Sequence, residues 1–318
     1  MLGYEVNGRR LATYGPFLAL LVACLFFTTQ SSRFLTLDNF SLISQQVMVV
    51  GVLAIGQTLV ILTAGIDLSC GMLMALGSVL MTMLAGQAAI PPLLAVLLGV
   101  GATTVAGFLN GLLVTRVKLP PFIVTLGTMN IAFALTQIVS SSQSVTDVPP
   151  LLTALGNTIT LFGTRIAFGT VTMLVLYTAA WWLLRETAGG RHLYAVGNNR
   201  EAARLAGINT DRVLLMVYTM AGVLYGVASL LAVARTGVGD PQAGQTENLD
   251  TVTAVVLGGT SLFGGRGVVL GSLIGALIVG VFRNGLTLMG VSSVYQILVT
   301  GILVILAVAT DQWSRRGS

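Results

Sequence analysis

Few side chains in this sequence are of types that could perform chemistry, and they are not spaced as a catalytic site. His192 is the single histidine and Lys118 the single lysine, so a histidine-based metal site or proton relay has nothing to build on. No glycine-rich loop ends in a lysine and a hydroxyl residue, the pattern that cradles nucleotide phosphates. We therefore expect no enzyme, no bound metal and no cofactor.

Two cysteines give no metal-binding signal. Cys24 and Cys70 lie inside separate apolar segments, and their spacing fits no metal site. The expectation is that both are inert packing residues.

One acidic residue, Asp67, interrupts an apolar region in the stretch from Gly65 to Gly71. Its carboxylate could cap the following helix, which we favour, or act as a gate in a pathway. Uncharged polar residues in the apolar runs could contact a sugar's hydroxyl groups in passing, and bonding between helices explains them equally well. The pathway candidates are Asp67, Ser69, Gln57, Thr58, Thr125, Asn130 and Gln296.

The longest polar interruption, residues 185–212, contains the signals of one short helix. Asn198 is a capping residue, and Glu201 three residues later completes a capping-box pattern. Gly207 supplies a left-handed residue that can end a helix. Either this is a solvated basic loop, or it is a docking element for a partner. The residues of the predicted element are Asn198, Asn199, Arg200, Glu201, Ala202, Arg204, Leu205, Ala206 and Gly207.

The composition predicts an all-α polytopic membrane protein. Of 318 residues, 55% are hydrophobic and only 8% are charged, with a mean hydropathy of +0.90. A soluble domain needs a more charged surface. The net charge of +5 does not indicate nucleic-acid binding, because the arginines are scattered between apolar runs, where they orient a protein in lipid.

The apolar runs predict a single membrane domain over residues 1–318 with about ten transmembrane helices. Basic residues concentrate in alternate loops and in both tails, which predicts cytoplasmic termini and a cytoplasmic loop at 185–212. The predicted spans lie near residues 11–29, 42–63, 70–86, 93–114, 121–140, 167–184, 213–234, 249–262, 268–284 and 292–310.

Two segments repeat a pattern of apolar runs broken by glycine. Residues 61–78 align without gaps on residues 255–272, which pairs Gly65 with Gly259 and Gly71 with Gly265. Matched, interrupted spans in two parts of a transporter indicate its pathway. Glycine-rich apolar sequence also aligns with itself by chance, so both interpretations stay open.

Three stretches in order, residues 56–71, 194–208 and 254–271, resemble the permease subunits of bacterial ABC importers for monosaccharides, the ribose-permease-like family. The resemblance covers nearly the whole chain from Phe34 onward. Three positions depart from the family pattern. Cys70 stands where valine is common, and Phe263 stands where alanine is common. In the family a glutamate often directly precedes leucine and aspartate, and here Asn248 interrupts that sequence.

The resemblance implies an inner-membrane permease, paired with a second copy or a similar chain and surrounded by membrane lipid. It further implies two cytoplasmic ATPase subunits, a periplasmic sugar-binding protein, and a coupling helix at residues 199–207 that fits the ATPase.

The main alternative is a self-powered secondary transporter or channel, in which Asp67 would couple transport to an ion gradient. A membrane enzyme is disfavoured because acid, base and metal constellations are missing. Transport by the isolated chain without an ATPase would favour the alternative. The sequence does not identify the sugar, the permease pairing or the residues lining the path.

Overall fold

Long apolar helices make up most of the computed structural model, which describes residues 2–88, 90–161 and 163–316. The elements in chain order are α1 (Leu2–Gln30), α2 (Leu37–Leu62), α3 (Cys70–Gly86), α4 (Pro92–Thr115), α5 (Pro121–Ser140), α6 (Pro150–Thr153), η1 (Ala154–Gly156), β1 (Thr158–Leu161), β2 (Thr164–Ala167), α7 (Phe168–Glu186), α8 (Ala188–Asn198), α9 (Arg200–Leu205), α10 (Thr210–Thr236), α11 (Glu247–Leu257), α12 (Val269–Leu288) and α13 (Ser293–Arg316).

Within the described residues, six helices are long and apolar enough to cross a membrane, namely α2, α4, α5, α7, α10 and α12. Shorter apolar helical stretches lie in α1, α3 and α13. This supports the polytopic helical class, and each predicted span overlaps a helix.

The predicted span at 249–262 is not a single continuous helix. Helix α11 has 11 residues, which rise about 16 Å, and the hydrocarbon layer is about 30 Å thick. The chain leaves the helix after Leu257 and forms a loop before α12 begins.

Helix α2 lies at the centre of the bundle and is buried over most of its length. Helix α10 packs along α4, α2 and α3. The α4–α10 contact is close because small residues line it. A Cβ atom at Gly107 would collide with the Tyr218 carbonyl oxygen and with Gly222, as in other tightly packed membrane helices.

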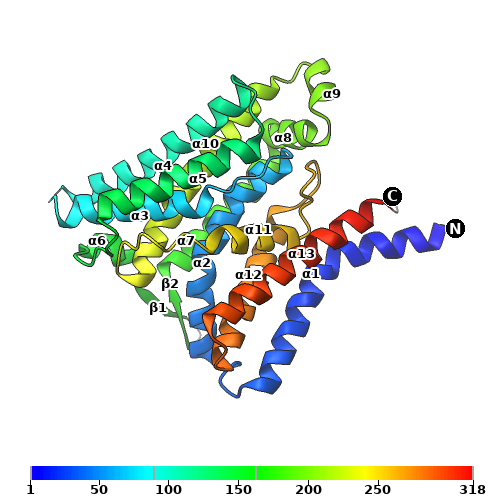
Figure 1. Cartoon of the computed structure of the whole chain (residues 1–318). Helices are drawn as coiled ribbons and strands as arrows, with labels where there is room; N and C mark the ends of the chain where they lie inside the picture. The colour runs from blue at the N-terminus through cyan, green and yellow to red at the C-terminus, as the bar shows by residue number, and fades with distance from the viewer. Residues whose placement is uncertain (1, 89, 162, 317–318) are drawn as a thin grey trace.

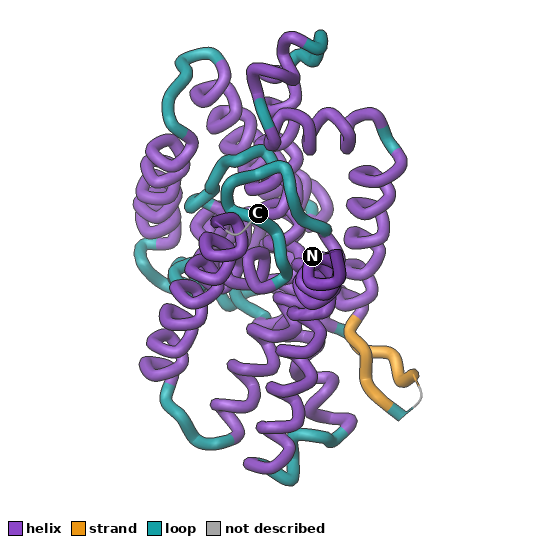
Figure 2. Tube along the Cα trace, turned by 90° about the vertical axis from the view of Figure 1, so that its right-hand side faces the viewer, coloured by secondary structure: helices purple, strands orange, loops and turns teal. Residues whose placement is uncertain are grey.

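The ends of the bundle differ. In Figure 1 both chain termini and α9 lie toward the right of the molecule, whereas α6 and the β1–β2 hairpin lie at its left. The antiparallel hairpin pairs Thr158 with Ala167 and stands apart from the helices in Figure 2. This region lies between the predicted spans at 121–140 and 167–184, so the hairpin is a small departure from the all-α expectation.

Two glycines of α4 test the packing. We expect Gly107→Ala to lower the apparent melting temperature in detergent, because overpacking a filled contact costs about 1–3 kcal/mol. Gly101 faces open space, with no atom within 4 Å of an added Cβ, so Gly101→Ala should be neutral or stabilising through helix propensity. A Gly107→Ala protein that melts at or above the parent temperature would contradict this packing.

Candidate functional site

Two interrupted segments lie against each other at the end of the bundle that carries α9. We call residues 62–69 the first break and residues 258–268 the second break. The Gly265 amide of the second break donates to the Leu62 carbonyl oxygen at 3.0 Å, and Gly264 packs on Ala64. The two glycine-interrupted segments noted in the sequence are therefore neighbours in space.

The preceding helices end in the same way. The left-handed residue is Ala64 (φ 60°) after α2 and Gly259 (φ 85°) after α11. The following amides, from Gly65 and Thr260, both donate to a carbonyl oxygen five residues back. Ala64 is thus the counterpart of Gly259, and the gapless alignment that paired Gly65 with Gly259 is wrong by one residue at this point.

Three of the four glycines paired by that alignment have neighbours too close for a side chain. An added Cβ at Gly65 would lie 2.7 Å from the Tyr218 hydroxyl, and one at Gly71 would lie 2.7 Å from Asn248 Oδ1. Gly265 is left-handed (φ 71°) and is pressed against α8. A side chain at any of these positions would displace a neighbouring element.

Asp67 is 1% exposed and anchors a chain of buried hydrogen bonds. Its carboxylate accepts from the Ser69 amide at 2.8 Å and from the Ser69 hydroxyl. It also accepts from the Tyr225 hydroxyl of α10 at 3.1 Å. Asn110 of α4 donates to Ser69 Oγ at 3.2 Å and accepts from Thr128 of α5. The network thus joins the first break to three helices.

The capping interpretation of Asp67 is wrong in its simple form. Ser69 is the N-cap residue of α3, and α3 has no side-chain capping bond. The carboxylate bonds the amide of the N-cap residue itself, so it fixes the turn before the helix.

The N-terminal ends of α3 and α11 meet inside the bundle. Asn248 Oδ1 accepts from the Gly71 amide at 2.6 Å and from the Cys70 thiol at 3.1 Å. The backbones touch nearby, where a Cβ at Gly244 would overlap the Gly71 carbonyl oxygen. Two short helices therefore share one end-to-end contact, which is typical of discontinuous helices in transporters.

The other predicted polar residues do not converge on one site. Thr125 bridges the first break, where it donates to the Ile66 carbonyl oxygen and accepts from the Leu68 amide, both at 3.1 Å. Thr58 shares a 2.7 Å hydrogen bond with Ser272 of α12. Thr58 therefore joins α2 to α12, whereas Thr125 joins α5 to the first break.

Three further candidates lie apart from this network. Gln57 is fully buried, and its side-chain amide has no hydrogen-bond partner among the described residues. Asn130 is exposed on α5 and donates to the Leu126 carbonyl oxygen. Gln296, at the start of α13, donates to Thr287 Oγ1 at 3.1 Å.

Helix α8, which the sequence did not predict, rests on both breaks. The Tyr194 hydroxyl donates to the Gly267 carbonyl oxygen of the second break at 2.8 Å. A Cβ at Gly197 would overlap the Leu62 carbonyl oxygen and lie 2.8 Å from the Gly265 nitrogen. Backbone therefore meets backbone where α8 crosses the two breaks, and no side chain separates them.

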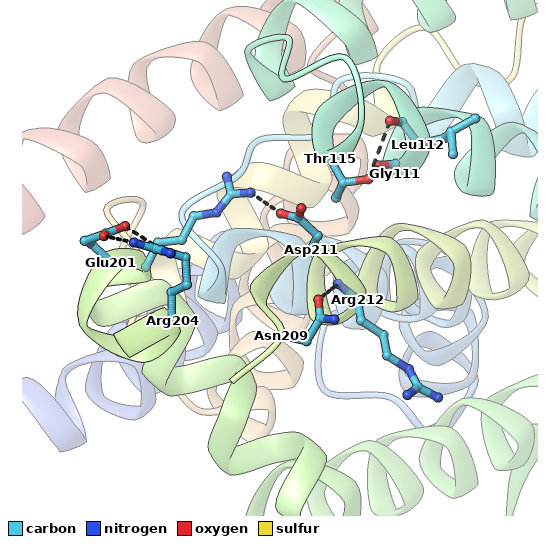
Figure 3. Close-up of polar contacts among 9 residues, drawn as sticks. Gly111, Leu112, Thr115, Glu201, Arg204, Asn209, Asp211 and Arg212 are labelled. Atoms are coloured by element: carbon cyan, nitrogen blue, oxygen red, sulfur yellow. Dashed lines mark hydrogen bonds and ion pairs between the residues drawn. The ribbon is translucent and has the colours of Figure 1, made fainter. Parts of the chain in front are cut away.

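The short exposed helix predicted at 198–207 is present as α9, with a different cap. Asn199 caps it by accepting from the Ala202 amide at 2.9 Å, whereas Asn198 is the last residue of α8. The predicted capping box does not form, because Glu201 pairs with Arg204 instead (Figure 3). The hydrogen bond from Arg204 lowers the pKa of the Glu201 carboxyl.

The apolar side chains of α9 point outward. Leu205 is 76% exposed, and Ala202 and Ala206 are exposed beside it. Gly207 is left-handed (φ 86°) and ends the helix as predicted. Arg200 pairs with Asp211 at 2.8 Å, which ties α9 to α10, and Asn209 caps α10 through the Arg212 amide at 3.0 Å (Figure 3).

A cavity of about 840 Å³ separates α9 from the loop between α4 and α5. Its lining includes Lys118, Arg200 and Tyr218. The Tyr218 hydroxyl is buried without a hydrogen-bond partner among the described residues. This end of the bundle is therefore open beside the short helix and polar in part.

Sequence reasoning missed two groups of residues. Tyr218 and Tyr225 are seven residues apart on one helix, so two phenolic hydroxyls share a face, and this spacing was an available signal. The second group is charged. Asp250 is buried in the first turn of α11 and pairs with Arg283 of α12 at 3.0 Å.

Comparison with known proteins identifies the family. Residues 39–308 match the family model described as a branched-chain amino acid transport system permease component. The fructose import permease of Rhizobium meliloti is 43% identical over 95% of this chain and 85% of its own length. The ribose import permease of Bacillus subtilis is 41% identical over 94% and 92%, and that of Escherichia coli K12 is 38% identical over 98% and 99%.

These matches span nearly the whole chain and agree with its six apolar helices, which identify a multi-pass protein of the inner membrane. The chain therefore belongs to this family of transport-system permease components, together with the ribose and fructose import permeases.

Proposed function

We propose that this chain is the permease subunit of an ABC importer that moves a monosaccharide, ribose or a similar pentose or hexose. Its relatives named above import ribose or fructose, whereas the family description names branched-chain amino acids. The similarity to the sugar permeases extends over most of both chains, which favours a sugar. The chain carries no hydrolytic step in this proposal, and a separate ATPase supplies the energy.

The observation that carries the proposal is the continuous link from α9 to the bundle. Helix α9 presents exposed apolar side chains at Ala202, Leu205 and Ala206, and a six-residue helix gains stability when a partner packs on it. Helix α8 joins α9 to both breaks. An ATPase docked on α9 can therefore move the ends of the interrupted helices.

The coupling surface in this proposal consists of the exposed residues around α9. Their polar members surround the apolar patch, so that a groove on the ATPase would bury Leu205 and meet charges at its rim. The proposed coupling residues are Asn198, Asn199, Arg200, Glu201, Ala202, Arg204, Leu205 and Gly207.

The proposed topology has about ten transmembrane helices with both termini in the cytoplasm. Its support is that the termini lie toward the same end as α9 (Figure 1). A second permease copy would complete the membrane unit as a homodimer or heterodimer, and a periplasmic sugar-binding protein would deliver the solute to the opposite end.

The contacts of Asp67 favour a structural role over a role in coupling transport to an ion gradient. Both of its carboxylate oxygens already have hydrogen-bond partners. We assign Asp67 to keeping the first break fixed against α10, so that movement of the break moves the helices bonded to it.

Reconstitution tests the proposed function. Proteoliposomes that contain the permease, its ATPase and its binding protein should take up D-ribose or D-fructose only when ATP is supplied on the cytoplasmic face. The permease alone should take up neither sugar. Uptake by the permease alone under a proton or sodium gradient would contradict the proposal and favour a secondary transporter.

A substitution on α9 tests the coupling surface. Leu205→Asp places a charge on the apolar docking face, and desolvating that charge against a partner is costly, so we expect copurification of the ATPase to fall at least tenfold. Leu161→Asp, at an exposed position of the hairpin, is the control and should leave copurification unchanged. Equal ATPase recovery with both variants would remove α9 from the interface.

A further inference from the structure

Charged side chains gather in the half of the bundle away from α9. Arg235 lies in the last turn of α10, Glu247 and Asp250 lie in the first turn of α11, and Arg283 lies in the last part of α12. Asp250 and Arg283 form a 3.0 Å ion pair in which the side chains are 3% and 31% exposed. Arg283 also donates to Thr246 Oγ1 at 3.0 Å. We call these four residues the outer cluster.

Two cavities flank Arg283. One of about 120 Å³ lies between α2 and α12 and is lined by Gln46, Arg235, Thr287 and Gln296. The other, of about 160 Å³, lies between α11 and α13 and is lined by Thr246, Asp250, Ser293, Gln296 and Thr300. Both are also lined by Arg283, and Gln296 belongs to both. One arginine and one carboxamide therefore separate two small polar spaces.

Polar groups in the first cavity have unused bonding capacity. Gln46 Oε1 is buried and has no hydrogen-bond partner among the described residues. Arg235 lines the same cavity and is exposed, so its guanidinium is accessible to a molecule that enters there. A buried acceptor without a partner is destabilising in a folded protein. A polar molecule that enters this space would satisfy both groups.

We propose that the two cavities form a transit site for a polyhydroxylated solute, a pentose or hexose, on the way from the outer end of the bundle. Sugar hydroxyls both donate and accept, so they can donate to Gln46 Oε1 and Asp250 and accept from Arg235, Arg283 and Gln296. Each cavity is small, so a single sugar ring would occupy one cavity at a time and would contact Arg283 and Gln296 from either side. This inference rests on the proposed function and adds the residues that contact the solute.

Protection from thiol labelling tests the site in the permease–ATPase complex. Gln296→Cys places a thiol between the cavities, and Ser292→Cys is a matched control, because Ser292 is exposed four residues away and lines neither cavity. At a D-ribose or D-fructose concentration about ten times the dissociation constant, labelling of Gln296→Cys by a small thiosulfonate should slow roughly tenfold. Labelling of Ser292→Cys should not change.

A second variant tests the role of Gln46 in the site. Gln46→Leu preserves the side-chain bulk but removes the acceptor, so in the Gln296→Cys background it should reduce the protection by sugar severalfold. Unchanged protection in this double variant would contradict the assignment of Gln46 to the site. Labelling of the unsubstituted chain measures the background from Cys24 and Cys70.

Uptake measured in parallel separates the two proposals. If the reconstituted importer takes up D-ribose or D-fructose while neither sugar protects Gln296→Cys, the transit site is wrong and the proposed function stands. If it takes up L-leucine but neither sugar, the proposed function is wrong, and the sugar site falls with it.

Discussion

The structure depends on one constraint: the backbone groups of interrupted helices must find partners inside an apolar bundle, where water cannot satisfy them. The Gly71 amide at the start of α3 uses Asn248 of α11, and the Gly265 amide of the second break uses the Leu62 carbonyl oxygen. Each interruption is therefore completed by the other. A movement that separated them would leave polar groups unpaired, so the two breaks are expected to move together.

This mutual dependence explains how a chain with little chemistry of its own can take part in active transport. Helix α8 contacts both breaks through Tyr194 and Gly197 and continues directly into α9. On the other side of the breaks, the Asp67 network reaches α4, α5 and α10. A push on the exposed helix is thus shared among most of the bundle, because close packing transmits displacement instead of absorbing it.

The sequence predicted the helices better than the contacts between them. Long apolar runs predicted the helices, and Gly207 was correctly predicted to end α9. The predicted cap, Asn198, is wrong by one residue, because only the extended backbone at Asn199 decides which of the two asparagine side chains faces the helix. Tyr225 bonds Asp67 across 158 residues, and no local pattern reports such a contact. The short length of α11 was hidden because the loop after it is also apolar and glycine-rich.

The most direct test of coupling is a substitution at Gly197. The measured quantity is the number of sugar molecules imported per ATP hydrolysed by the reconstituted importer. Gly197→Ala forces α8 away from the two breaks but leaves the exposed face of α9 intact. We predict that the ATPase still binds and hydrolyses ATP while the ratio falls by roughly fivefold or more. Gly189→Ala, on the same helix with only a 3.5 Å contact, should keep the parent ratio. An unchanged ratio for Gly197→Ala would contradict transmission through α8.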